Sequence, residues 1–200
     1  ENHRKSHSRI LTNMTLSVIM NLAMAVMAVG AVIGHCRKSP MRIVLRYFTA
    51  LSNLFCAAVS VAVAVTRLSG TVPETILVMK FVGTAAVAIT FLTVMLFLGP
   101  VVYNYKVLLT GPVWLHLVCP IISILTYILW DKPEMSFGGV FGGVLPVLLY
   151  GGMYLYRILL ASPAKRWEDI YGFNRDGKWL FSLVSMMAAA FIVSLLLWLI

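Results

Sequence analysis

Six apolar runs, separated by helix-breaking residues, constrain the fold of this chain more than any other feature. They cover residues 10–34, 43–66, 75–98, 112–130, 140–161 and 178–200. A bilayer core is crossed by roughly 20 apolar residues in an α-helix, so each run can span it. A proline lies in every connection between the runs. The sequence therefore predicts an all-α polytopic membrane bundle of six transmembrane helices, forming one domain over residues 1–200.

The composition agrees with a membrane protein rather than a soluble one. The chain is 60% hydrophobic and only 12% charged, with a mean hydropathy of +0.92. Its net charge of +9 comes from bases in short loops and tails, and no aromatic–basic platform accompanies them. We therefore expect no nucleic-acid partner. The first, third and fifth connections hold ten bases against five on the other side, which predicts that they face the cytoplasm.

The charged residues near the apolar runs are expected to avoid the membrane interior. Lys80 lies inside the third run, and we expect its long side chain to reach the opposite surface by snorkelling. All seven acidic residues fall at predicted helix ends, in loops or in the N-terminal tail. Ion-coupled transporters more often carry a carboxylate within the membrane, so this distribution disfavours that class.

Thr49 and His116 are the strongest candidates for chemistry. The runs that contain them both follow odd-numbered connections, so both enter the membrane from the same face. If the helices begin near residues 43 and 112, Thr49 lies roughly 9 Å and His116 roughly 6 Å below that face. A histidine is the base best suited to take a proton from a hydroxyl near neutral pH. The pair is predicted to form a nucleophile and its base.

Polar residues around this pair supply further candidates. Thr49, Asn53, Cys56 and Ser60 recur at helical spacing, with Ser52 alongside, and should face the bundle interior. For an oxyanion we expect Asn53 as donor, or Tyr103 or Asn104 from the third connection. Asp169 of the fifth connection lies on the same side and is a candidate to orient His116. Tyr154 is a candidate for lining a substrate pocket, or for an interfacial aromatic belt.

Several polar or small residues are better explained by packing. Small polar side chains on membrane helices usually serve helix association, and this explanation applies to Thr49 taken alone. Gly138, Gly139, Gly142 and Gly143 form small-xxx-small pairs typical of close helix packing. His3 and His7 have helical spacing but no further ligand, and the three cysteines show no paired spacing. We expect no metal and no organic cofactor.

Two segments resemble a known family of membrane proteins. Residues 46–54, RYFTALSNL, are similar to the second-helix signature of the androgen-induced-gene family. Residues 114–120, WLHLVCP, with Trp130 at the helix end, resemble the fourth-helix histidine motif of that family. Its members are six-helix proteins, with predicted bacterial relatives, and its animal members are described as threonine hydrolases of fatty acid esters of hydroxy fatty acids. The resemblance implies Thr49 as nucleophile and His116 as base. Residues 169–174, DIYGFN, depart from the aromatic–proline run common in that family.

The function expected from these residues is hydrolysis of a lipid ester inside the membrane. Thr49 would attack the ester carbonyl, giving an acyl-threonine that water then hydrolyses. The expected partners are a lipid ester or fatty-acyl substrate and membrane lipids. Two alternatives remain open. One is a non-enzymatic small transporter or lipid-binding membrane protein whose polar stripe lines a pathway, and the other is an acyltransferase that uses the same two residues.

Overall fold

Long helices running up and down make up nearly all of the described chain. The computed structural model describes residues 2–96 and 113–200, with side chains from residue 12 onward, and these residues contain helices but no strand. The longer helices are α1 (Asn2–Cys36), α3 (Phe48–Leu68), α4 (Glu74–Leu92), α6 (Cys119–Leu129), α7 (Leu145–Leu155) and α8 (Trp179–Leu199). The shorter ones are α2 (Met41–Val44), η2 (Trp114–Val118), η3 (Phe137–Val144), η4 (Tyr156–Leu160), η5 (Pro163–Lys165) and η6 (Arg175–Gly177).

Five helical segments among the described residues are long and apolar enough to cross a membrane. They are Thr12–Cys36, Phe48–Leu68, Glu74–Leu96, Phe137–Leu160 and Trp179–Leu199. A further apolar helix, Trp114–Leu129, is shorter. The prediction of an all-helical, multi-pass membrane protein is therefore confirmed at this level.

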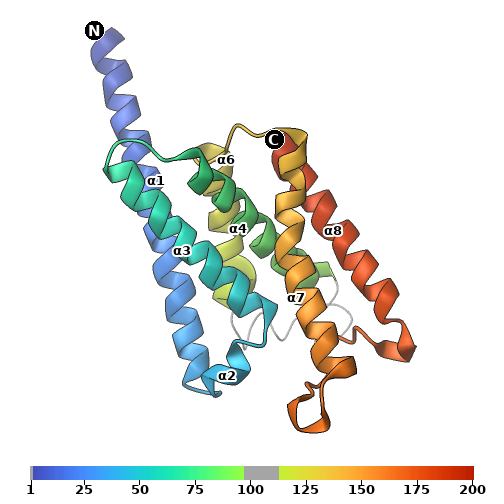
Figure 1. Cartoon of the computed structure of the whole chain (residues 1–200). Coiled ribbons are helices and arrows are strands. Elements are labelled where there is room, and N and C mark those ends of the chain that lie inside the picture. Colours follow the sequence, from blue (N-terminus) through green and yellow to red (C-terminus); the bar gives the residue numbers. More distant parts are fainter. Residues whose placement is uncertain (1, 97–112) are drawn as a thin grey trace.

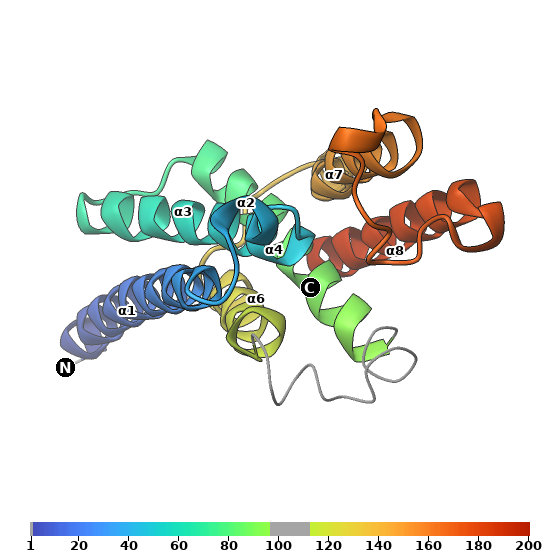
Figure 2. The same cartoon turned by 90° about the horizontal axis from the view of Figure 1, so that it is seen from below.

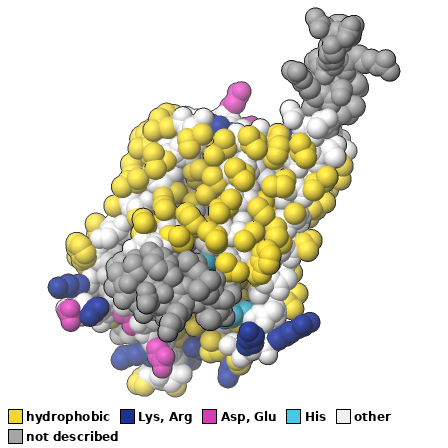
Figure 3. Space-filling model, turned by 180° about the vertical axis from the view of Figure 1, so that it is seen from behind, with side chains coloured by type: hydrophobic (Ala, Val, Ile, Leu, Met, Phe, Trp, Pro, Cys, Tyr) yellow, Lys and Arg dark blue, Asp and Glu magenta, His cyan; other side chains and the backbone are white. Residues whose placement is uncertain are grey.

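The outer surface has the character of a membrane protein. Apolar side chains cover the middle of the face shown in Figure 3, and lysine and arginine gather at the lower end of that face. Large apolar side chains of α8 such as Phe181, Val184 and Leu196 are exposed. Such a continuous apolar belt bordered by charge is what a bilayer would cover.

Helix α4 lies at the centre of the bundle and joins its two halves. It contacts α3 and α6 on one side and η3, α7 and α8 on the other, while α1 packs on α3 and α6 (Figures 1 and 2). Its faces are closely covered because small residues allow the neighbours to approach. At Gly83 an added Cβ would lie 3.3 Å from the Cα of Cys56 on α3.

One glycine of η3 lies at a close contact between helices, whereas Cβ atoms added at Gly138 and Gly139 would meet only residues 135 and 136. Gly143 is buried at the junction of three helices, where an added Cβ would lie 3.0 Å from Ala85 Cβ on α4 and would overlap Ser194 on α8. Even a methyl group there would force the Ser194 hydroxyl to rotate and would press against Ala85 and Ser194 Cβ. The close approach of η3 to α4 and α8 therefore depends on this glycine.

Both candidate catalytic residues lie at the lower end of the bundle in Figure 1, where α3 begins and where the chain enters α6 through η2. The starting point of α3 differs from the prediction. Residues 41–44 form the separate helix α2, and α3 begins only at Phe48. Thr49 is therefore in the first turn of its helix, nearer the end of the bundle than a helix starting at residue 43 would place it.

Candidate functional site

Thr49 lies at the N-terminus of α3, where backbone amides have no partner within the helix. Tyr47 precedes the helix in an extended conformation and makes no side-chain cap. The N–H of Phe48 donates instead to the hydroxyl of Tyr171, at 3.1 Å. The N–H of Thr49 has no acceptor among the described residues, and its side chain is half-buried. A free N–H at the positive end of a helix favours an oxyanion or another negatively charged group.

His116 lies in a turn of π-helix, η2, immediately before α6. Pro120 stands four residues later and has no N–H to donate to the His116 carbonyl, so the ordinary α-helical bond cannot form there. The helix widens instead, and the N–H of Cys119 donates to the carbonyl of Trp114. The His116 side chain is 8% exposed, and its Nδ1 is buried without a partner among the described residues.

Asn53 connects the helices that carry these two residues. Its amide nitrogen donates to the carbonyl of Thr49, at 2.8 Å, and to the carbonyl of Leu115, at 3.0 Å. Leu115 directly precedes His116, so the backbone at His116 is held beside the first turn of α3. Both protons of the Asn53 amide are used in this bridge. Asn53 therefore has no free amide proton for an oxyanion in this structure, and its side chain connects the two helices instead.

Ser52 also stabilises the first turn of α3. Its hydroxyl bonds to the Thr49 carbonyl at 3.2 Å and lies 3.1 Å from the Thr90 hydroxyl on α4. The Thr49 carbonyl thus receives bonds from two side chains, and both are buried. This double attachment fixes the backbone of Thr49 and leaves its own hydroxyl without a bond among the described residues.

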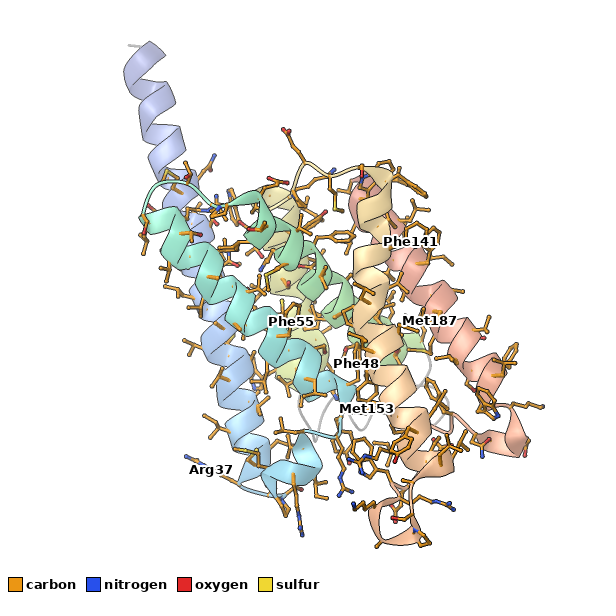
Figure 4. All side chains as sticks on the ribbon, in the orientation of Figure 1. Arg37, Phe48, Phe55, Phe141, Met153 and Met187 are labelled. Atoms are coloured by element: carbon orange, nitrogen blue, oxygen red, sulfur yellow. The ribbon has the colours of Figure 1, made fainter. Side chains whose placement is uncertain are left out.

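The connection between α7 and α8 folds back onto the start of α3. Tyr154 of α7 is buried and donates to Asp169 Oδ1 at 3.0 Å. The Asp169 carboxylate also accepts the backbone N–H groups of Phe173 and Asn174, at 2.8 and 2.7 Å. Phe48, labelled in Figure 4, lies between α3 and α7, with its ring centroid 5.1 Å from that of Tyr150. Aromatic contacts therefore hold this loop against the end of the bundle that carries Thr49.

These contacts correct the roles expected of Asp169 and Tyr154. The bonds of Asp169 are to its own loop and to Tyr154, so it shapes a turn and does not orient His116. Tyr154 fastens that loop to α7, a role that differs from both pocket lining and an exposed aromatic belt. Tyr103 and Asn104, the other candidate oxyanion donors, lie outside the described residues.

His35 is a neighbour of His116 that the sequence did not reveal. It is half-buried at the C-terminal end of α1, close enough to His116 for an electrostatic interaction. Sequence reasoning placed His35 at the same membrane face but treated it only as an interfacial residue. Its contact with His116 depends on α1 packing against η2, which sequence spacing does not report. The described residues contain no cluster of three or more metal-ligating side chains.

A second polar cluster lies toward the opposite end of the bundle. Lys80 is fully buried, and its amine donates to Asn21 Oδ1 and Ser60 Oγ, both at 2.8 Å. Asn21 in turn donates to Asp131 Oδ2 at 2.8 Å, and Arg67 forms an ion pair with Asp131 Oδ1 at 2.8 Å. Four segments, α1, α3, α4 and the end of α6, are joined by this network.

The second cluster overturns the expectation for Lys80 and adds a finding about Asp131. Lys80 does not snorkel to the surface, because buried oxygen acceptors on α1 and α3 hold its amine inside the bundle. Asp131 follows the end of α6, as predicted, but its side chain is wholly buried. The signal that could have found the network was the set of polar residues on the first two runs, Ser17, Asn21 and Ser60, together with Lys80 in the middle of the third run.

Hydroxyl and thiol groups lie between the two clusters. The Ser123 hydroxyl of α6 is 2.9 Å from the Thr84 hydroxyl on α4 and 3.1 Å from Cys56 Sγ on α3. Cys56 is in turn close enough to Lys80 for an electrostatic interaction, and it lies one turn along α3 from Asn53. Buried polar groups therefore recur from Asp131 at one end of the bundle to His116 at the other.

Comparison of the chain with protein-family models, with curated proteins and with solved structures finds no match. The interpretation of the site therefore depends on its own residues and geometry.

Proposed function

We propose that this protein is an intramembrane hydrolase that cleaves a lipid ester, with Thr49 as nucleophile and His116 as base. In this proposal Trp114–Leu129 is part of a sixth membrane-spanning segment, and the protein lies in a bacterial cell membrane. The observation that carries the proposal is the Asn53 bridge between the carbonyls of Thr49 and Leu115. It keeps the nucleophile and the histidine helix together at one end of the bundle.

The chemistry follows from groups that have no other partner among the described residues. The His116 imidazole takes the proton of the Thr49 hydroxyl as its oxygen attacks the ester carbonyl. The oxyanion that develops is held by the free N–H of Thr49 at the N-terminus of α3. His116 then returns the proton to the departing alcohol, leaving an acyl-threonine. Water, deprotonated by His116, releases the fatty acid and restores the hydroxyl.

The proposal is tested by combining turnover with covalent labelling. Purified protein is treated with a fluorophosphonate probe, and the labelled residue is identified by mass spectrometry. Thr49→Ala should abolish labelling and ester hydrolysis, while Thr49→Ser should keep part of both because it keeps the hydroxyl. His116→Ala should lower turnover by about 10²–10⁴-fold. Thr66→Ala is the matched control, since Thr66 bonds only to carbonyls of its own helix at the far end of α3.

Two results would contradict the nucleophile assignment. Thr49→Ala protein that hydrolyses the ester as fast as wild type removes Thr49 from the mechanism. Labelling at Cys56 or Cys119 in place of Thr49 would instead identify a thiol enzyme.

A second function, proton movement across the membrane, is favoured by the buried Lys80 and Asp131. Ionisable groups inside a membrane bundle commonly mark ion or proton pathways. Here Asn21 connects Lys80 to Asp131, and the Ser123 hydroxyl and the Cys56 thiol form a further buried polar contact between α6 and α3. Proteoliposomes containing a pH-sensitive dye would show proton flux that Lys80→Met removes. Flux no greater than in protein-free liposomes would exclude this function.

A further inference from the structure

Two arginines from distant parts of the chain converge on one indole at the end of the bundle that carries Thr49. The guanidinium carbon of Arg46, just before α3, lies 5.2 Å from the ring centroid of Trp167. That of Arg157, in η4 at the end of α7, lies 5.5 Å from the same centroid. Both arginines are half-buried. Stacking on an aromatic face restricts a guanidinium while leaving its N–H groups available for a ligand.

The backbone around this cluster is fixed by hydrogen bonds. The Tyr150 hydroxyl donates to the carbonyl of Arg46 at 2.6 Å, and the N–H of Trp167 donates to the carbonyl of Arg157 at 3.1 Å. Trp167 also packs against Tyr154, with ring centroids 6.3 Å apart. The arginines therefore start from anchored positions, which lowers the entropy lost when a ligand is bound.

The cluster carries positive charge that the described residues do not compensate. Neither Arg46 nor Arg157 forms an ion pair with a described carboxylate, and the side chains of both lack a hydrogen bond there. The nearby Asp169 carboxylate is bonded to Tyr154 and to two loop amides. Lys165 and Arg166 add further charge in the same loop. A half-buried pair of cations that makes no direct ion pair with a described carboxylate favours an anionic ligand.

The surroundings indicate that this ligand is an amphiphile. Tyr156 and Leu160, on the same π-helical turn as Arg157, are 54% and 76% exposed. The cluster thus lies where basic side chains and an indole meet an apolar surface, which is the composition of a membrane interface. An anionic head would meet the guanidinium groups while its hydrocarbon tail covers the exposed apolar side chains.

We propose that Arg46, Arg157 and Trp167 bind the anionic head, a carboxylate or a phosphate, of a membrane amphiphile. Binding at this site does not depend on catalysis. The further statement that the bound amphiphile is the substrate or product of Thr49 rests on the proposed hydrolase function, and on the position of Arg46 three residues before Thr49.

The experiment compares ligands that differ only in the head group. Binding to the purified protein in neutral detergent is measured for oleate against oleyl alcohol, and for phosphatidylglycerol against phosphatidylcholine. Acetate and inorganic phosphate test whether the head alone suffices. The double variant Arg46→Gln/Arg157→Gln is compared with Lys38→Gln/Arg42→Gln, which removes the same charge from exposed residues at the same end. Trp167→Leu tests the stacking platform.

We expect oleate or phosphatidylglycerol to bind more tightly than the matched neutral or zwitterionic lipid. Arg46→Gln/Arg157→Gln should weaken that binding by about tenfold or more, as expected for losing charge-assisted hydrogen bonds. The affinity of the control variant for the anionic lipid should stay near that of wild type. The affinity of Trp167→Leu should lie between those of wild type and the double arginine variant. Preference for oleate would identify a carboxylate site, and preference for phosphatidylglycerol a phosphate site.

Three results would overturn the proposal. They are equal weakening in the control variant, equal affinity for charged and uncharged heads, and equally tight binding of acetate or phosphate alone. Thr49→Ala separates this inference from the proposed function, because it should retain the anionic ligand while losing hydrolysis. If Thr49→Ala keeps hydrolysis and the arginine variant still loses the ligand, the hydrolase mechanism fails and the binding site stands.

Discussion

The side-chain amide of Asn53 lies 3.0 Å from the carbonyl of Leu115 and thereby joins α3 to the π-helical turn of His116. The same nitrogen bonds to the Thr49 carbonyl, so one side chain links the backbone of Thr49 to the backbone next to His116. Its Oδ1 is buried without a partner among the described residues. Asn53 therefore connects α3 to η2 in addition to facing the interior of the bundle.

Replacement of Asn53 by alanine should loosen this junction. Two buried carbonyls lose a donor, so we expect the free energy of unfolding to fall by about 1–3 kcal/mol. Asn53→Asp should lower the free energy of unfolding further, because an ionised carboxylate faces the same carbonyls and cannot donate a hydrogen bond to them. Thermal unfolding in detergent measures both changes, with Thr66→Ala as the control on the same helix. An Asn53→Asp protein as stable as wild type would show that the bridge contributes nothing.

Replacing only one member of the ion pair between Arg67 and Asp131 should strongly lower the free energy of unfolding. Asp131→Ala removes the buried carboxylate to which Arg67, Asn21 and Ser17 donate, which should cost about 3–5 kcal/mol. Replacing both charged residues by methionine should cost less than the two single changes added together. A double-mutant cycle by chemical denaturation measures this coupling, and purely additive changes would mean that the pair acts independently.

Gly143 should tolerate no side chain. Gly143→Ala should lower the free energy of unfolding by about 1–3 kcal/mol through overpacking against Ala85 and Ser194. Gly30 on α1 is the control, because an added Cβ there meets nothing within 4 Å. Gly30→Ala should be neutral or stabilising, by up to about 1 kcal/mol, since alanine favours a helix. Equal unfolding temperatures for the two variants would contradict the packing role.

The membrane orientation predicted from charge can be measured directly. Single cysteines at the exposed positions Arg166 and Lys132, in a background without native cysteines, report opposite ends of the bundle. An impermeant maleimide added to intact cells should label the residue at 132 and spare the one at 166. The reverse pattern would place the Thr49 end of the bundle outside the cell.

Local sequence signals predicted the helices better than their polar contacts. The prolines and apolar runs located the long helices, because both act within a few residues of themselves. They could not show that residues 41–44 form a helix apart from α3, since the break at residues 45–47 contains no proline or glycine. The acceptors of Lys80 lie 59 and 20 residues away along the chain, so its burial depends on how the helices assemble.

In the candidate site, too, the residues could be predicted from the sequence but their contacts with other helices could not. Thr49, Asn53 and His116 could be selected from helical spacing and from the motif resemblance, and the structure places them at one end of the bundle. Three features depend on the tertiary structure instead. Both amide protons of Asn53 are used, Tyr154 anchors Asp169, and His35 lies near His116. No pattern within one helix reports which partner a polar side chain will meet on another.

The described length of the helix from Trp114 to Leu129 bears on the surrounding lipid. At 1.5 Å per residue these residues extend roughly 24 Å, less than the roughly 30 Å of an ordinary hydrocarbon core. Their outward side chains Ile121, Leu125 and Leu129 are exposed, so a span limited to these residues would leave a hydrophobic mismatch. A bilayer accommodates such hydrophobic mismatch by thinning locally. Thinning would draw glycerol-level ester groups toward His116, and would favour residence in thin membranes over thick, sterol-rich ones.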